Sequence, residues 1–436
     1  MRFRAAAPVT LFFFCLASAL WALQASQRKD IAVFGLSCHQ WDIPDSALGA
    51  VDEEIRGVFI NLGRFNVLGL AQRLEPGDLA AFAAAVRRYR EERVERPEEV
   101  QVGRESFTQA DFQRLAGSFM MVVPSLASYV LEASGAGFRV MLKTSFTLIN
   151  AEQDRSFAQA FVESEGLEAS PEGAARRAVD GIAPRLAYEL RRIPELQLET
   201  GVLEVHGSEV ILELGRDLGV KDGDEYLLYS KTLASESGLL VVKEVGEQVS
   251  VGRLIYARAR PGEGDSLREL PLFGVETTPY VHVAGGAFHP RGLTALVGLR
   301  QSVSRGFYAF RPIFGLEAPL LPNIAAALPL NLYVGGEYVI RVGRLEVTPH
   351  ASLGVGGACL WHLGESVSED RKFAFTHIGG TAGVNLSCLL ANKLLLLLEA
   401  GYLHWFSLIP AKVFAGGLSF PDYDGLYFGG GLTIKL

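Results

Sequence analysis

The sequence predicts a multidomain protein: a periplasmic α/β domain, a small all-β domain, and a C-terminal eight-stranded antiparallel transmembrane β-barrel. Three observations predict this class. Of the 436 residues, 49% are hydrophobic, but beyond the N-terminus no apolar run reaches the ~18 residues that a transmembrane helix needs. After about residue 273, charged residues become sparse and glycines frequent. That same region alternates apolar and polar residues in many short segments, as barrel strands facing lipid must.

Residues 1–25 have the pattern of an export signal peptide. Arg2 and Arg4 precede the apolar stretch 5–20, and Ala22-Leu23-Gln24-Ala25 offers a small-residue cleavage site. An uncleaved anchor helix is the alternative, but the stretch is short and polar residues follow at once. Cys15 follows a bulky aromatic residue, which argues against lipid attachment there. We therefore expect export and cleavage.

The net charge and the cysteine content argue against a nucleic-acid-binding protein and against a disulfide-stabilised fold. The net charge is −8 and no basic stripe with interleaved aromatic residues occurs, so we expect no nucleic-acid partner. Cleavage of the signal would leave Cys38, Cys359 and Cys388, an odd number, so we expect no disulfide framework.

Residues 26–197 alternate strand and helix signals. Apolar strands are predicted over 30–37 and 64–70, with a helix from Pro44 to Leu62 between them. Further helices are predicted over 78–92 and 108–116.

The rest of this region predicts a hairpin and a helix. The hairpin joins strands 119–132 and 138–150 across a Gly-containing turn. The helix begins at Ser170-Pro171-Glu172, a capping hydroxyl followed by proline and an acid, and ends before Pro194. Its predicted buried face comprises Ala175, Val179, Ile182, Leu186 and Leu190.

This order of elements resembles the periplasmic α/β domain family of the curli-secretion lipoprotein and the TolB N-terminal domain. The resemblance covers about Asp30 to Leu196. It is carried by the strands IAVFGL and RFNVLGL, the hairpin VVPSLASYVLE…FRVMLKTSFTLINAE, and the helix that ends in RRIPEL. The charged stretch from Tyr89 to Gln101 is an insertion relative to that pattern. The resemblance implies a binding or assembly role.

Residues 198–262 predict a small all-β domain, and the polar, turn-rich residues that follow predict a linker over 263–275. A hairpin is expected at His206-Gly207-Ser208 and a turn at Lys221-Asp222-Gly223-Asp224. The run from Gly215 to Asp224 resembles the C-terminal domain of the flagellar assembly protein T family.

Residues 276–436 predict the barrel. Alternation is clearest over 345–363, where Leu345, Val347, Leu353 and Val355 share one face and polar residues or glycines share the other. The eight expected strands are 280–288, 293–303, 308–318, 330–342, 345–363, 378–390, 394–406 and 426–436.

The connections predict the orientation of the barrel. An even strand number leaves both barrel ends on the periplasmic side, together with residues 26–275. The connections expected there, 304–306, 343–344 and 392–393, are tight, whereas 364–372 and 407–424 on the outer side are long. The ending Gly429-x-Gly431-x-x-Ile434-x-Leu436 resembles the recognition signal of outer-membrane barrels. A soluble lipocalin-like barrel is the alternative, and it would have an apolar interior and a polar exterior.

Charged residues predicted inside the barrel form the candidate site. Eight strands leave room for little more than filling side chains, so a lumen-plugging network of paired charges is expected. A narrow ion path or an acid–base site is the alternative. The predicted inward residues are Arg300, Arg311, Glu317, Glu337, Arg341, Glu346, His350, His377, Glu399 and Lys435.

Histidines within the barrel raise the question of a metal site or a hydrolase triad. His350, His362 and His377 share the inward face of neighbouring predicted strands. Because no G-x-S-x-G elbow is present, we expect no catalytic residue, metal or cofactor. Cys359 and Cys388 lie near opposite ends of adjacent strands, too far apart for a disulfide.

The sequence thus predicts a non-enzymatic outer-membrane protein whose barrel anchors periplasmic binding or assembly domains. The expected partners are outer-membrane lipid and either another envelope protein or further copies of the chain. A small channel or secretion-type transporter and a lipid-acting outer-membrane enzyme are the alternatives.

Overall fold

The computed structural model describes residues 26–38, 45–92, 99–116, 120–135, 137–150, 155–285, 293–320, 327–360, 373–408 and 423–436. They divide into two compact units. The first comprises residues up to Thr200 with 213–220 and 246–249, and the second comprises 201–212, 221–245 and 250–436. The expected signal peptide 1–25, Cys15 and the expected outer connection 364–372 lie outside the described residues.

A five-stranded sheet forms the centre of the first unit. Its order is β2-β1-β5-β6-β7, in which β1 is parallel to β2 and to β5, and the longer strands β5, β6 and β7 are antiparallel. The strands span Lys29–Val33 (β1), Phe65–Gly69 (β2), Met120–Ser134 (β5), Gly137–Asn150 (β6) and Arg155–Glu168 (β7).

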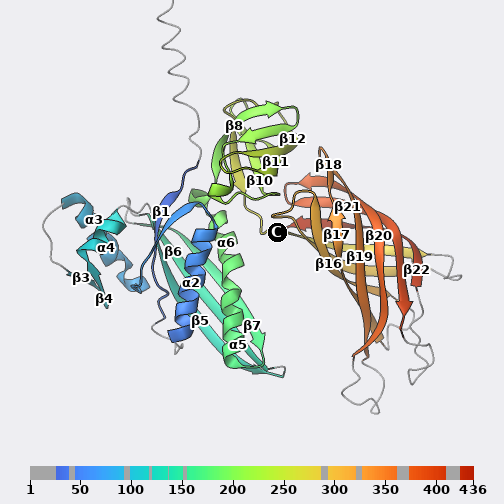
Figure 1. The fold of residues 1–436 in the computed structure, drawn as a ribbon, viewed down its shortest axis with the longest axis horizontal. Coiled ribbons are helices and arrows are strands. Elements are labelled where there is room, and N and C mark those ends of the chain that lie inside the picture. The colour runs from blue at the N-terminus through green and yellow to red at the C-terminus, as the bar shows by residue number, and fades with distance from the viewer. Residues whose placement is uncertain are drawn as a thin grey trace, which may run out of the picture. The chain divides into compact units, whose positions relative to one another are not determined.

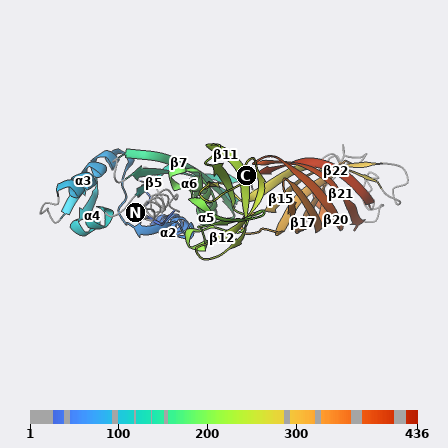
Figure 2. The ribbon, with the colours of Figure 1, turned by 90° about the horizontal axis from the view of Figure 1, so that it is seen from above.

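Helices cover one face of this sheet. Helices α2 (Asp45–Asn61), α5 (Pro171–Asp180) and α6 (Ile182–Arg192) lie side by side (Figure 1), and Figure 2 shows them as a layer against the strands. Their core includes Ile31 and Val33 of β1, whereas the alternate residue Ala32 faces the opposite side. Among the described residues, no helix is long and apolar enough to cross a membrane.

The opposite face carries a second, smaller core. Helices α3 (Leu79–Glu92) and α4 (Gln109–Ala116) pack there with the hairpin of β3 (Glu99–Val102) and β4 (Glu105–Thr108). Phe34, Phe82 and Phe107 form its aromatic centre, with ring centroids 5.0 to 6.3 Å apart. Part of the stretch 89–101 therefore forms ordered structure on the sheet.

Two expectations for this unit were wrong. The single helix expected from Ser170 is two helices, because the backbone turns at Gly181 and Pro184 opens the second. The cap itself occurs as expected, since the Ser170 hydroxyl accepts a hydrogen bond from the Gly173 N–H at 3.1 Å. The strand β7 was not expected at all.

A small closed barrel of six strands begins the second unit. Its order is β10-β11-β12-β9-β8-β13. The strands span Glu199–His206 (β8), Glu209–Leu212 (β9), Glu225–Ser230 (β10), Ser235–Val245 (β11), Ser250–Ala257 (β12) and Ser266–Leu270 (β13). β13 pairs along the whole of β10 and closes this barrel, so the expected linker over 263–275 is instead partly a strand of the small domain.

The rest of the second unit is the predicted eight-stranded antiparallel barrel. It closes through pairing of β14 with β22 and of β17 with β19, and β18 continues β17 after a break at Val339. The strands span Val275–Gly285 (β14), Thr294–Val303 (β15), Phe310–Leu320 (β16), Ala327–Tyr338 (β17), Ile340–Val342 (β18), Leu345–Leu360 (β19), Phe373–Ala391 (β20), Leu394–Ser407 (β21) and Tyr423–Lys435 (β22).

Candidate functional site

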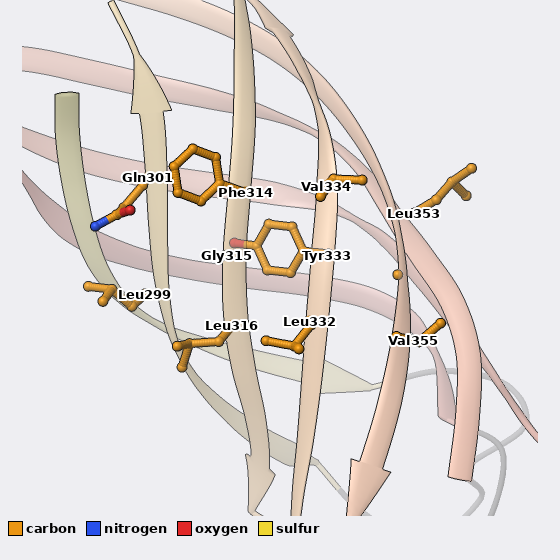
Figure 3. Close-up of a pocket in the computed structure, with 11 residues that line it drawn as sticks. Leu299, Gln301, Phe314, Gly315, Leu316, Leu332, Tyr333, Val334, Leu353 and Val355 are labelled. Atoms are coloured by element: carbon orange, nitrogen blue, oxygen red, sulfur yellow. The ribbon is translucent and has the colours of Figure 1, made fainter. Parts of the chain in front are cut away.

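The exterior of the large barrel is apolar on every strand. Many outward aliphatic and aromatic side chains are more than 40% exposed, among them Leu353 at 75% and Val334 at 68%. Figure 3 shows one such area, where Leu299, Leu316 and Leu332 lie in a row across adjacent strands. This surface is the inverse of a soluble binding barrel, which would place polar residues outside.

The interior is polar, and all ten residues selected from the sequence lie in it. The side chains of Arg300, Glu399 and His350 are each no more than 6% exposed. The others are buried or nearly so: Arg311, Glu317, Glu337, Arg341, Glu346, His377 and Lys435. These side chains lie on the face of the strands opposite to the exposed apolar residues.

Glu399 is the centre of the main polar cluster. Its Oε2 lies 3.0 Å from Arg300 Nη1 and 3.4 Å from His282 Nε2. Its Oε1 accepts a hydrogen bond from the Tyr427 hydroxyl at 2.9 Å and lies 3.2 Å from His350 Nε2. A buried carboxylate is tolerated only when its charge and lone pairs are engaged in this way.

A second carboxylate joins this cluster through tyrosines. The Tyr280 hydroxyl donates to Glu317 Oε2 at 3.2 Å and lies 3.2 Å from the Tyr333 hydroxyl. His282 stacks on the Tyr280 ring with centroids 4.3 Å apart. His282 and the three tyrosines were not selected from the sequence. They alternate with outward residues along their strands, so this alternation predicts that they point inward.

Glycines make room for these tyrosine rings. A Cβ on Gly315 would lie 2.5 Å from the Tyr333 ring, and one on Gly298 would lie 2.2 Å from the Tyr280 ring. Figure 3 shows Tyr333 pointing toward Gly315 on the neighbouring strand. Gly298 and Gly315 are therefore packing positions, each covered by a tyrosine ring.

An apolar layer lies at the end of the barrel that carries the long connections. Ala284, Leu296, Leu403 and Trp405 pack together with the Tyr427 ring. Trp405 and Leu296 are fully buried. Among the described residues, this layer adjoins the Glu399 cluster through Tyr427.

The opposite end of the barrel, called the short-turn end, comprises residues 304–309, 343–344 and 392–393 with the strand ends beside them. Ion pairs fill it: Arg311 Nη1 lies 3.0 Å from Glu276 Oε2, and Arg341 Nε lies 3.0 Å from Glu346 Oε1. Glu337 lies opposite Arg311 in the ladder.

The small barrel contacts this short-turn end within the second unit. Lys435 Nζ donates to Glu225 Oε1 of β10 at 2.6 Å, and both side chains are at most 5% exposed. Burial raises the pKa of the Glu225 carboxyl, and the Lys435 ammonium opposes that rise. Arg305 Nε lies 2.7 Å from Asp224 Oδ1.

The remaining short turns contact the small barrel as well. The Tyr256 hydroxyl donates to Asn392 Oδ1 at 2.7 Å, and the Arg344 guanidinium lies 4.2 Å from the centroid of the Tyr256 ring. Leu389 and Leu395 of the large barrel share a core with Leu239, Val241 and Ile255 of the small one. Together these contacts cover the short-turn end.

The histidines do not form the site that was considered from the sequence. His350 lies opposite Gly383 and His377 opposite Gly356, well apart along the ladder, and His362 lies outside the described residues. Instead His350 shares Glu399 with His282. In the described part of the chain, no group of three or more His, Cys, Asp or Glu side chains could hold a metal ion.

No protein-family model matches the chain, and no curated protein matches it. Among solved structures, the PelC dodecamer from Paraburkholderia phytofirmans is 13% identical, with the match covering 38% of this chain and 90% of that chain at a TM-score of 0.24. Neisserial surface protein A is 14% identical, covering 37% of this chain and 96% of that one at a TM-score of 0.26.

The outer membrane protein OprH from P. aeruginosa, solved in DHPC micelles, is 14% identical. That match covers 37% of this chain and 99% of that chain at a TM-score of 0.25.

Proposed function

We propose that the large barrel spans the bacterial outer membrane and anchors the preceding domains to it in the periplasm, without enzymatic activity or a cofactor. One observation carries this proposal: the barrel exposes an apolar exterior and fills its interior with paired charges. Such a surface is stable only where lipid replaces water. In the described part of the barrel, charged pairs and tyrosine rings occupy the interior.

The short-turn end faces the periplasm in this proposal. An even number of strands leaves both ends of the barrel sequence on one side. That side carries the small barrel, which the chain enters from the exported α/β domain. The contacts of Lys435, Arg305 and Asn392 then hold the small barrel against the membrane anchor.

The filled lumen argues against transport through the barrel. The ion pairs at the short-turn end, the Glu399 cluster and the apolar layer around Trp405 follow one another along the interior. An ion that passes through the barrel would have to disrupt several of these buried pairs.

Strand β7 offers the best surface for binding a partner to the periplasmic domains. This strand is 14 residues long and forms one edge of its sheet, so its outer backbone groups can pair with another chain. Phe161 and Leu167 on it are 51% and 49% exposed. We propose that a further envelope protein or a second copy of the chain binds there.

The test is photo-crosslinking of the full chain in cells. A photoreactive amino acid replaces Phe161 in one variant and Ile60 of α2, which is 56% exposed, in a matched control. We expect a discrete adduct from position 161 only, recovered with the outer-membrane fraction. Equal labelling from both positions would reject the β7 surface, and an adduct found only in the soluble fraction would reject the anchor.

A further inference from the structure

A groove lies on the exterior of the large barrel, over strands β17 and β19 to β21. Its volume is about 1070 Å³, within the range of small-molecule sites. Ala351, Gly380 and Ala382 form its floor, while Leu353 and Phe406 stand at its sides. A second groove of about 530 Å³ adjoins it across Val334 and Leu353 (Figure 3).

The register of the strands explains the hollow. Ala351 pairs with Ala382, and on the far side it pairs with Gly336, so one row across three strands carries only small outward residues. In the next row Gly380 lies between Leu353 and His404. Elsewhere the exterior carries large side chains, such as Leu396, which pairs with Leu432.

A polar corner borders this groove on a face that is otherwise apolar. The Tyr402 hydroxyl donates to Asp424 Oδ2 at 2.9 Å, and His404 Nδ1 lies 3.5 Å from the same oxygen. Asp424 is 5% exposed, whereas His404 is 37% exposed and lines the groove. Ionisable groups facing lipid are costly, so they mark a function.

Two neighbouring side chains hold the His404 ring in place. Asp424 engages its Nδ1 side, and the Phe406 ring packs edge-on against it with centroids 3.9 Å apart. The imidazole can therefore present Nε2 to a hydrogen-bonding group at the rim while an apolar chain fills the floor.

We propose that this groove binds one acyl chain of a membrane lipid, with His404 hydrogen-bonded to an ester or hydroxyl oxygen near the head of that chain. This inference rests on the proposed function, because the membrane places lipid against this surface. An acyl lipid has an apolar chain and a polar head, which match the apolar floor and the single polar corner of the groove. A second copy of the barrel would instead present its own apolar exterior to His404 and Asp424.

The test uses the full chain reconstituted in phosphatidylcholine vesicles containing a phosphatidylethanolamine with a photoactivatable acyl chain. Mass spectrometry then locates the adducts. We expect several-fold more adducts on residues 351–355 and 378–382 than on the comparison surface of Leu396, Leu398 and Leu432. The double variant Ala351→Leu, Ala382→Leu should remove the excess, whereas Ala400→Leu, outside the groove, should keep it.

The variant His404→Phe removes the imidazole of the polar corner and keeps the small residues that form the hollow. It should lower the excess about fivefold, the worth of one hydrogen bond, while the comparison surface labels as before. Even labelling of all exterior surfaces would overturn the inference and leave the membrane barrel intact. Absence of labelling everywhere would instead overturn the proposed function, and crosslinks from the groove to a second copy would replace lipid by a protein partner.

Discussion

At the scale of single residues, the buried charges inside the barrel act as a set of mutually dependent pairs. Arg300 and Glu399 lie 3.0 Å apart and are almost fully buried, so neither can be hydrated when the other is removed. Alternation identified both from the sequence. Tyr280, His282 and Tyr427 share the inward parity but were not selected, because the close glycines that leave room for their rings are known only from the structure.

Glu399→Gln should therefore destabilise the barrel strongly. The variant removes the carboxylate that pairs with the buried Arg300 guanidinium, and removing one partner of a buried pair costs about 3–5 kcal/mol. The measurement is the urea midpoint of the purified chain in detergent, followed by loss of the compact band on a cold gel. The double variant Arg300→Met, Glu399→Leu should recover most of the loss. Unchanged midpoints for both variants would show that the pair is not coupled.

At the scale of elements, one strand that the sequence did not reveal is essential to the α/β domain. β7 places Ala158, Ala160, Gly166 and Ser164 toward the helices, small residues that carry little strand signal. They are small because α5 passes close by: a Cβ on Gly166 would lie 2.1 Å from the Ala174 carbonyl oxygen. β13 was not predicted either, because its buried face includes the charged Glu269.

Gly166→Ala should loosen the packing of α5 on β7. The added methyl group forces the helix away, and overpacking of this kind costs about 1–3 kcal/mol. Hydrogen exchange of α5 and β7 in the full chain should accelerate. Gly135→Ala is the matched control, since nothing lies within 4 Å of a Cβ there, and it should leave exchange unchanged. Equal exchange in both variants would contradict the close approach.

The contact between the two barrels gives a second prediction at this scale. Lys435→Met leaves Glu225 buried without its cation, so hydrogen exchange in β10 and β13 should rise while exchange in β20 stays constant. Lys243→Met removes a partly exposed pair with Glu209 and should change exchange little. No difference between the two variants would mean that the ion pair does not hold the small barrel in place.

At the scale of the whole molecule, the sequence predicts the architecture of the large barrel better than that of the α/β domain. Period-two alternation, tight turns and an even strand count are enough to define a barrel, because lipid outside and a narrow lumen inside constrain every residue. The sheet of the α/β domain is set by long-range pairing, such as β1 between β2 and β5, which local patterns do not encode.

The filled lumen predicts that the purified chain is electrically silent. In planar bilayers we expect no ion conductance, because charged pairs and the Trp405 layer close the interior. Steady single-channel conductance that changes on Glu337→Gln would show an open path through the barrel and would favour the transport alternative.

The most direct test of the membrane barrel is the electrophoretic mobility of the full chain, taken from the outer-membrane fraction, with and without boiling. A closed barrel held by backbone ladders resists detergent when cold, so the unboiled protein should migrate faster than the boiled protein. A single mobility under both conditions, in a chain that also leaves the membrane on alkaline washing, would contradict a lipid-embedded barrel and with it the anchoring role.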